Sequence, residues 1–226
     1  MSTLFVIGTP IGNLEDTTAR AVRVLGEVGA IAAEDTRITA RLLARYGIRK
    51  PLISYRAPVE RRSLPRVMSA LDENDVALVS DAGTPTLSDP GQALVEAAWA
   101  AGHTVVPIPG PSAVTAALSV AGYSGPGFTF LGYLPRKPGE VRRLLATLVE
   151  SPRPTVAFDS PYRVLKSLAL IAEVLPERQL TVGRELTKVH EQVLRGTAGE
   201  VMSALGDRAR GEFTLVISGQ NRPLGA

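Results

Sequence analysis

The sequence predicts an α/β protein of two domains, with a mainly parallel N-terminal sheet and a mixed C-terminal sheet. From the N-terminus, short apolar runs alternate with helix-like stretches, and Gly and Pro cluster between them. This rhythm changes after about residue 122. The 226 residues are 45% hydrophobic, which is enough for two small cores. We therefore expect domains at 1–113 and 114–226, and a ligand cleft between them.

The strands expected in the first domain are continuous apolar runs, which are typical of strands buried on both faces of a parallel sheet. They are Leu4–Ile7, Ala30–Ala33 and Val76–Val79, and a further strand is entered at His103 before Val105 and Val106.

Three helices are expected between these strands. Asp16 is placed as the N-cap of the first, and the second runs from about Thr36 to Tyr46. Asp89 and Pro90 predict a cap and a first-turn proline for the third, which continues through Trp99.

In the second domain, the same criteria predict helices near Glu140, from Pro161 to Leu175 after a Ser160 cap, and from Ala198 to Leu205. Hairpin-like spacing near the C-terminus favours a mixed sheet. Its expected strands are Phe128–Leu131, Thr155–Phe158, Leu180–Arg184 and Phe213–Ile217.

Composition excludes several functional classes. The chain has no cysteine, which excludes thiol nucleophiles and disulfides, and its two histidines leave few options for a Ser-His hydrolase. No apolar run is long enough for a signal peptide or a membrane-spanning helix, so we expect a cytoplasmic protein with no membrane partner. We also expect no metal, because cysteine ligands are absent and histidines are few. The first 113 residues hold 11 basic and 12 acidic side chains, whereas the remainder hold 14 and 10. The basic excess therefore lies in the second half.

Four segments follow expected strands and should meet at one edge of the sheet, because ligands of open α/β sheets bind at the carboxyl ends of strands. They contain neither a P-loop nor a Gly-x-Gly-x-x-Gly fingerprint, and they offer small residues, backbone amides and the carboxylate of Asp81. S-adenosylmethionine fits such a set. The alternative is that Asp81 and Gly83 only build a tight turn. The segments are Gly8–Leu14, Ala33–Arg37, Ser80–Pro85 and Pro109–Ala113.

These segments resemble the motifs of the tetrapyrrole methylases (class III methyltransferases), and above all their ribosomal-RNA-methylating branch. The resemblance spans nearly the whole chain. In the first half it rests on Gly8–Asp16, Ala32–Arg37, Val79–Pro85, Ser88–Gly91 and Pro109–Ser112. In the second half it rests on Gly132–Pro135, Phe158–Arg163, Arg184–Lys188, Glu191 and Gly211–Val216. The chain departs from the family pattern at Asp159, Tyr162 and Arg56–Glu60, and it lacks a C-terminal extension.

The resemblance implies a homodimer with S-adenosylmethionine in the interdomain cleft. The implied reaction is methylation of a ribose 2′-hydroxyl on a cytidine in the decoding region of 16S rRNA, free or within the 30S subunit. The cofactor-binding residues carried over are Pro10, Ile11, Asp81, Gly83, Thr84, Ser112, Ala113, Phe158 and Leu186.

A 2′-hydroxyl must lose its proton when it is methylated, so a proton acceptor is needed. Glu34, Asp35 and Lys188 are the catalytic candidates, with the two acids preferred. Asp35 has an alternative role as the cap of the helix that starts near Thr36. Arg37 either binds an RNA phosphate or pairs with Glu34.

Basic residues of the second half are the main candidates for RNA contacts, with a solvated helix face as the alternative for each. Together with Arg37 they are Arg136, Lys137, Arg142, Arg143, Arg163 and Arg184. Two other functions stay open: a tetrapyrrole methylase of the same family, and a non-catalytic RNA-binding module.

Overall fold

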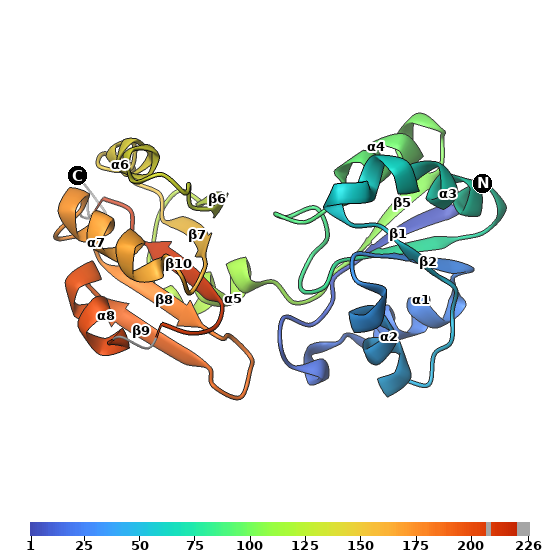
Figure 1. Ribbon diagram of the computed structural model, residues 1–226, viewed down its shortest axis with the longest axis horizontal. Coiled ribbons are helices and arrows are strands. Elements are labelled where there is room, and N and C mark those ends of the chain that lie inside the picture. Colours follow the sequence, from blue (N-terminus) through green and yellow to red (C-terminus); the bar gives the residue numbers. More distant parts are fainter. Residues whose placement is uncertain (207–208, 221–226) are drawn as a thin grey trace. The chain divides into compact units, whose positions relative to one another are not determined.

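The computed structural model describes residues 1–206 and 209–220. The chain forms two compact units, Met1–Ser112 and Ala113–Ala226, and each contains one five-stranded sheet (Figure 1).

The sheet of the N-terminal unit is parallel throughout, as predicted, and its strand order is β3-β2-β4-β1-β5. Every residue of β2 and β4 is buried, which explains why both read as uninterrupted apolar runs. The strands are β1 (Thr3–Ile7), β2 (Ala30–Ala33), β3 (Leu52–Ser54), β4 (Val76–Val79) and β5 (Thr104–Ile108).

Two helices cover each face of this sheet (Figure 1). Helices α1 (Ala19–Glu27) and α2 (Thr36–Arg45) bury Leu25 and Leu43 against one face. Helices α3 (Glu60–Glu73) and α4 (Gln92–Ala100) bury their apolar side chains against the other face.

Neighbouring strands β1 and β4 form a topological switch point. The chain leaves β1 toward β2 on one side of the sheet and leaves β4 toward β5 on the other. The loops that follow β1 and β4 therefore start side by side at the carboxyl edge and lead to helices on opposite faces of the sheet, and this edge is where ligands of open α/β sheets bind.

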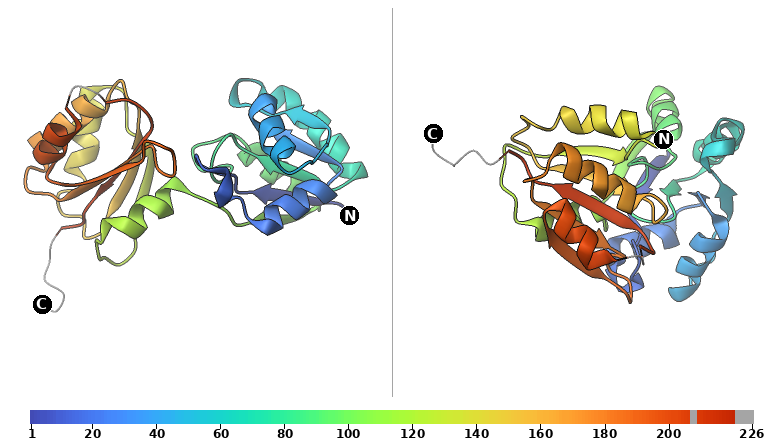
Figure 2. Two further views of the ribbon diagram at one scale, coloured as in Figure 1. Left: turned by 90° about the horizontal axis from the view of Figure 1, so that it is seen from below. Right: turned by 60° about the vertical axis from the view of Figure 1, so that its left-hand side comes forward.

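The C-terminal unit has a mixed sheet, as predicted. Its strand order is β6-β7-β10-β8-β9, and only β6 and β7 pair in parallel. One face packs on α5 (Ala113–Ala121), and the other packs on α6 (Pro138–Ala146), α7 (Val164–Val174) and α8 (Ala198–Leu205), as Figure 2 shows. The strands are β6 (Thr129–Tyr133), β7 (Thr155–Asp159), β8 (Leu180–Arg184), β9 (Gln192–Gly196) and β10 (Phe213–Ile217).

Three predicted helix starts were wrong. Asp16 lies in a 3-10 turn, Leu14–Asp16, and the Thr18 side chain caps α1 by accepting from the backbone of Ala21. Helix α4 starts at Gln92, after Gly91 with φ 130°. Helix α7 starts at Val164, because residues 160–163 form a turn first.

Four elements had no counterpart in the sequence prediction: β3, α3, α5 and β9. Strand β3 has only three residues, and α3 contains Pro65, which normally ends a helix. Among residues 1–206 and 209–220, no helix is long and apolar enough to span a bilayer.

Candidate functional site

The four strand-end segments meet at the carboxyl edge of the N-terminal sheet, as the sequence predicts. Thr9 and Gly83 bridge the loops after β1 and β4: Thr9 N donates to Gly83 O at 2.8 Å, and Gly83 N donates back to Thr9 O at 3.0 Å. The buried Thr9 hydroxyl also donates to Ser80 O at 3.2 Å. Sequence reasoning did not single out Thr9, because its partners lie more than 70 positions away.

The loops after β1 and β5 touch backbone to backbone at Gly8 and Gly110. Gly8 N donates to Ile108 O at 3.0 Å. A Cβ atom added to Gly110 would lie 2.6 Å from Gly8 O, and one added to Gly8 would lie 2.9 Å from Gly110 Cα. Only glycine fits at both positions, so this part of the edge presents main chain to a ligand.

The carboxylates of Glu34 and Asp81 link the ends of β2 and β4 through hydrogen bonds to the backbone. Glu34 Oε2 accepts from the backbone N–H of Asp81 at 3.1 Å, and Asp81 Oδ1 accepts from the backbone N–H of Asp35 at 2.9 Å. The Asp81 carboxylate therefore makes more than a local turn: it joins two parallel strands at the edge where a ligand is expected.

Burial raises the pKa of three carboxyl groups at this edge. It raises the pKa of Glu34 and of Asp81, and neighbouring carboxylates add to both shifts. Burial, together with the charges of Glu34 and Asp81, raises the pKa of Asp89 to about 6, although a hydrogen bond with Ser80 opposes this. Such a cluster favours a cationic ligand, because a nearby positive charge stabilises the ionised carboxylates.

Asp89 was assigned by its sequence to a helix cap, and it contributes to the acidic cluster instead. Asp-Pro before an apolar helix is a common signal for a helix cap, so nothing in the sequence indicated that Asp89 belongs to an acidic cluster.

Asp35 has a different environment from Glu34. Its carboxylate caps α2 by accepting from Arg37 N at 2.8 Å, and it also accepts from Arg37 Nε at 3.0 Å. The hydrogen bonds and charge of Arg37 lower the Asp35 pKa. Of the two roles considered for Arg37, the pair with Glu34 is not formed, because the guanidinium pairs with Asp35.

The remaining cofactor candidates of the N-terminal unit line the same loops. Pro10 and Ile11 are buried, and an added Cβ on Gly83, which has φ +76°, would lie 3.4 Å from Ile11 Cγ2. Thr84 is half-buried beside Gly83, and Ser112 is half-buried at the end of the unit.

Three further cofactor candidates lie in the C-terminal unit. Ala113 is the first residue of α5. Phe158 and Leu186 pack against the apolar cluster formed by α5 and the sheet. The Phe158 ring makes edge contacts with Phe130 and Tyr133, at centroid distances of 5.1 and 5.6 Å.

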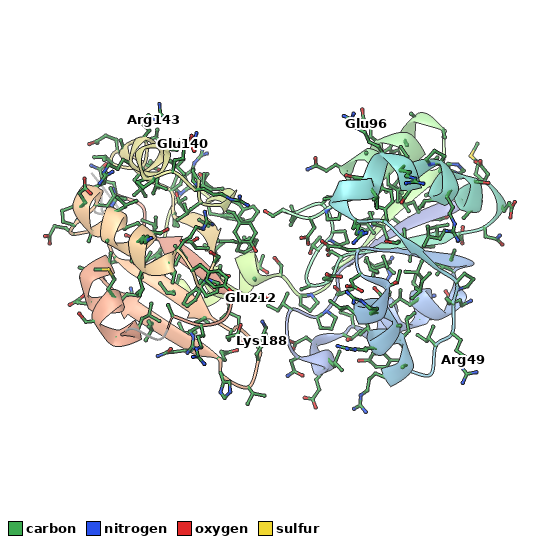
Figure 3. All side chains as sticks on the ribbon, viewed as in Figure 1. Arg49, Glu96, Glu140, Arg143, Lys188 and Glu212 are labelled. Carbon is green, nitrogen blue, oxygen red and sulfur yellow. The ribbon has the colours of Figure 1, made fainter. Side chains whose placement is uncertain are left out.

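Lys188 is held by two acids of the same unit (Figure 3). Its Nζ lies 3.0 Å from Glu185 Oε1 and 3.0 Å from Glu212 Oε2. Burial alone would lower the Lys188 pKa, but these two carboxylates outweigh it and raise the pKa. Lys188 is therefore protonated near neutral pH and is unsuited to accept a proton.

Most basic residues expected to meet RNA have partners within the C-terminal unit. Arg163 pairs with the buried Asp159 at 3.0 Å and donates to the carbonyls of Leu134 and Pro135, so it holds the loop after β6 in place.

The other paired cations lie closer to the surface. Arg142 binds Glu173 through two nitrogens, Lys137 pairs with Glu140, and Arg184 donates to the carbonyl of residue 210. Within the part of the chain that the structure describes, Arg136 and Arg143 have no polar partner, and Figure 3 shows Arg143 at the outer surface of α6.

A family model and several curated proteins that resemble this chain agree on its family. The family model described as "Tetrapyrrole (Corrin/Porphyrin) Methylases" matches residues 3–202. Ribosomal RNA small subunit methyltransferase I of Neisseria meningitidis serogroup B is 48% identical over 95% of this chain and 75% of its own length. The Thermotoga maritima protein of that name is 45% identical over 97% of this chain and 100% of its own.

Solved structures agree at the level of the fold. The methyltransferase CobJ has a TM-score of 0.70 at 20% identity and covers 100% of this chain and 98% of its own. Uroporphyrin-III-C-methyltransferase from Thermus thermophilus has a TM-score of 0.65 at 21% identity, over 96% of this chain and 94% of its own. The family match, the close relatives and the shared fold together establish that this chain belongs to the tetrapyrrole methylase family.

Proposed function

We propose that this chain is an S-adenosylmethionine-dependent methyltransferase that acts on small-subunit ribosomal RNA. Support comes from the family match and from relatives at 42–48% identity that carry the name ribosomal RNA small subunit methyltransferase I. We further propose that the acceptor is the ribose 2′-hydroxyl of a cytidine in the decoding region of 16S rRNA, in the 30S subunit.

The observation that carries the cofactor assignment is the carboxyl edge of the N-terminal sheet. Its glycine-rich main chain suits the adenosine part, which needs close backbone partners. Its three carboxyl groups with raised pKa suit the sulfonium and ammonium cations. Loops 8–14, 80–85 and 109–113 contain no lysine or arginine that would repel these cations.

We propose that nine residues bind the cofactor. Pro10, Ile11, Asp81, Gly83, Thr84 and Ser112 come from the first unit, and Ala113, Phe158 and Leu186 from the second. The Phe158 and Leu186 side chains are already fixed by packing in their own unit, so their main chain offers the closer approach to a ligand.

Glu34 is the proton acceptor that its environment supports best. When bound, S-adenosylmethionine supplies an electrophilic methyl group on sulfur. The half-buried Glu34 carboxylate has a raised pKa and is fixed by the Asp81 backbone, so it can take a proton from a hydroxyl aligned beside it. Asp35 is less basic because it is occupied by Arg37 and the α2 cap. Lys188 is kept protonated by Glu185 and Glu212, so it is not the proton acceptor.

We also propose that the protein works as a cytoplasmic homodimer. Transfer of labelled methyl groups to purified 30S subunits that lack the modification tests the function. Label on 16S rRNA is expected, and label on a tetrapyrrole such as uroporphyrinogen III with none on RNA would overturn the assignment. Calorimetry with S-adenosylmethionine separates both enzymes from a non-catalytic RNA-binding module, which would give no heat of binding.

A further inference from the structure

Helix α2 and the turn after it carry a row of five cations in the N-terminal unit, of which all but Lys50 are exposed. Segment 36–51 contains five basic residues and no acidic one. We call these residues the α2 ridge; they are Arg37, Arg41, Arg45, Arg49 and Lys50.

The ridge occupies the outward face of α2. Arg37, Arg41 and Arg45 are spaced four residues apart, so they lie on one face of the helix and repeat about every 6 Å. All three are exposed, whereas Leu42 and Leu43 bury the opposite face against the sheet.

Four of these cations are uncompensated. Among residues 1–206 and 209–220, Arg41, Arg45, Arg49 and Lys50 have no ion pair or hydrogen-bonded side-chain partner. In the C-terminal unit, by contrast, Arg142, Arg163 and Lys188 are paired with acids, although Arg136 and Arg143 have no such partner among the described residues. Arg41, Arg45, Arg49 and Lys50 therefore form a group of unpaired cations in the half of the sequence that has no basic excess.

The ridge ends beside a surface hollow of about 420 Å³. The hollow lies between the end of α2 and edge strand β3, and Arg49 and Lys50 border it together with Leu43 and Ile48. Figure 3 shows Arg49 projecting outward at this end of the unit. A concave surface with two cations at its border can seat a polyanionic chain more closely than a flat one can.

The other end of the ridge starts at the candidate site. Asp35 caps α2, and its backbone N–H donates to Asp81 Oδ1 at 2.9 Å. Since α2 begins at the carboxyl edge of the sheet and runs back toward the amino edge, the ridge extends away from the acidic cluster. An RNA chain bound along the ridge would therefore reach the strand ends where Glu34, the proposed proton acceptor, lies.

We propose that the α2 ridge binds the phosphate backbone of the substrate RNA. The proposal rests on the proposed function, which supplies the RNA, and it adds the surface that holds it. Four of the five cations are arginines, whose planar guanidinium groups bind phosphate oxygens through two hydrogen bonds.

A triple substitution tests the ridge directly. Arg41→Ala, Arg45→Ala and Arg49→Ala remove three exposed, unpaired cations, and alanine preserves α2 because it has the best helix propensity. Binding to 30S subunits is measured across a series of KCl concentrations. We expect affinity about tenfold weaker at 0.1 M salt, and a slope of log K against log salt that is shallower by about 2. Affinity for S-adenosylmethionine should not change.

The matched control lies on the opposite face of the same sheet. Arg61, Arg62 and Arg66 of α3 are also exposed, and their triple alanine variant loses the same charge. It should keep the wild-type affinity and slope. An equal loss of affinity in both variants would overturn the proposal, because it would reflect net charge only. Unchanged binding of the α2 variant would overturn it as well. The two proposals fail separately. If the wild-type protein does not methylate 30S subunits, the proposed function is wrong. The proposal about the α2 ridge would still hold if RNA binding depends on the α2 cations.

A cross-link identifies what the ridge touches. Ala44 is exposed between the cations, and benzoylphenylalanine at this position should cross-link to 16S rRNA in 30S subunits. The same group at Arg62 is the control. Cross-links from position 44 to ribosomal proteins alone, or equally strong RNA cross-links from both positions, would overturn the assignment.

Discussion

At the scale of single residues, two neighbouring acids have opposite properties. Glu34 and Asp35 are adjacent in sequence, yet burial raises the pKa of Glu34 while Arg37 lowers that of Asp35. Sequence reasoning selected both as proton acceptors and separated them only by giving Asp35 the alternative role of a helix cap, which the structure confirms. Burial is the largest cause of the raised Glu34 pKa, and the hydrogen bond from the Asp81 backbone, 47 positions away, opposes it.

Asp89 gives a prediction about stability and pH. The pKa of Asp89 is about 6 in the folded protein and near the ordinary value of 3.8 in the unfolded chain, so the folded state binds more protons between these pH values. Its contribution to stability is therefore lost as pH rises from about 4 to 6. Asp89→Asn removes this loss, so the melting temperature of the variant relative to wild type should rise between pH 4.5 and 7.5. A difference that does not vary with pH would contradict the assignment.

The same carboxylate predicts a pH-dependent affinity for the cofactor. Ionised Asp89 attracts a cation, so S-adenosylmethionine should bind wild type more tightly as pH rises through about 6. Asp89→Asn should weaken binding at pH 7.5 and flatten this dependence, as followed by calorimetry. Equal dependence in both proteins would exclude Asp89 from the cofactor site.

At the scale of elements, the most accurate predictions concern buried strands. Strands β2, β4, β8 and β10 begin and end where their apolar runs predict, because burial on both faces leaves a continuous signal. Helix α3 was missed because Pro65 and its many charges conceal an amphipathic face. Helix starts were also hard to place, because a loop acid such as Asp89 can have a tertiary partner in place of a helix N–H.

The cap of α2 is testable by paired variants. Asp35→Ala removes the acceptor of the Arg37 N–H and should lower the melting temperature of the N-terminal unit. Asp35→Asn keeps a cap and loses only an exposed ion pair, so it should stay close to wild type. Thermal unfolding followed by circular dichroism compares them, and equal losses would argue against the cap.

The contact between Gly8 and Gly110 gives a prediction for the loops. Gly110→Ala places a Cβ atom 2.6 Å from Gly8 O and should destabilise the N-terminal unit by about 1–3 kcal/mol while weakening cofactor binding. Gly26→Ala in α1 meets no atom within 4 Å and should be neutral or stabilising. Denaturant unfolding measures the free energy of unfolding of both variants. An unchanged value for Gly110→Ala would contradict the prediction, because it would show that the two loops move apart at little cost.

At the scale of the whole molecule, charge is distributed more finely than the two halves of the sequence indicate. The first half has almost balanced charge, but Glu34, Asp35, Asp81 and Asp89 cluster after the strand ends, and five of its eleven cations form the α2 ridge. The second half has the basic excess, although several of its cations pair with acids of the same unit, such as Arg163 with Asp159. Convergence of the four loops was predictable from βα topology. The partners within the cluster were not, because they join residues far apart in the chain.

The most direct test of the account is the chemistry of the modified nucleotide. 16S rRNA from cells that lack this protein is incubated with S-adenosylmethionine and either wild type or Glu34→Gln, as 30S subunits, and then digested to nucleosides for mass spectrometry. We expect 2′-O-methylcytidine with wild type and a rate lower by about 10²–10⁴-fold with Glu34→Gln, whose fold and cofactor affinity are measured in parallel. A methyl group on the base, or an unchanged rate in the variant, would contradict the account.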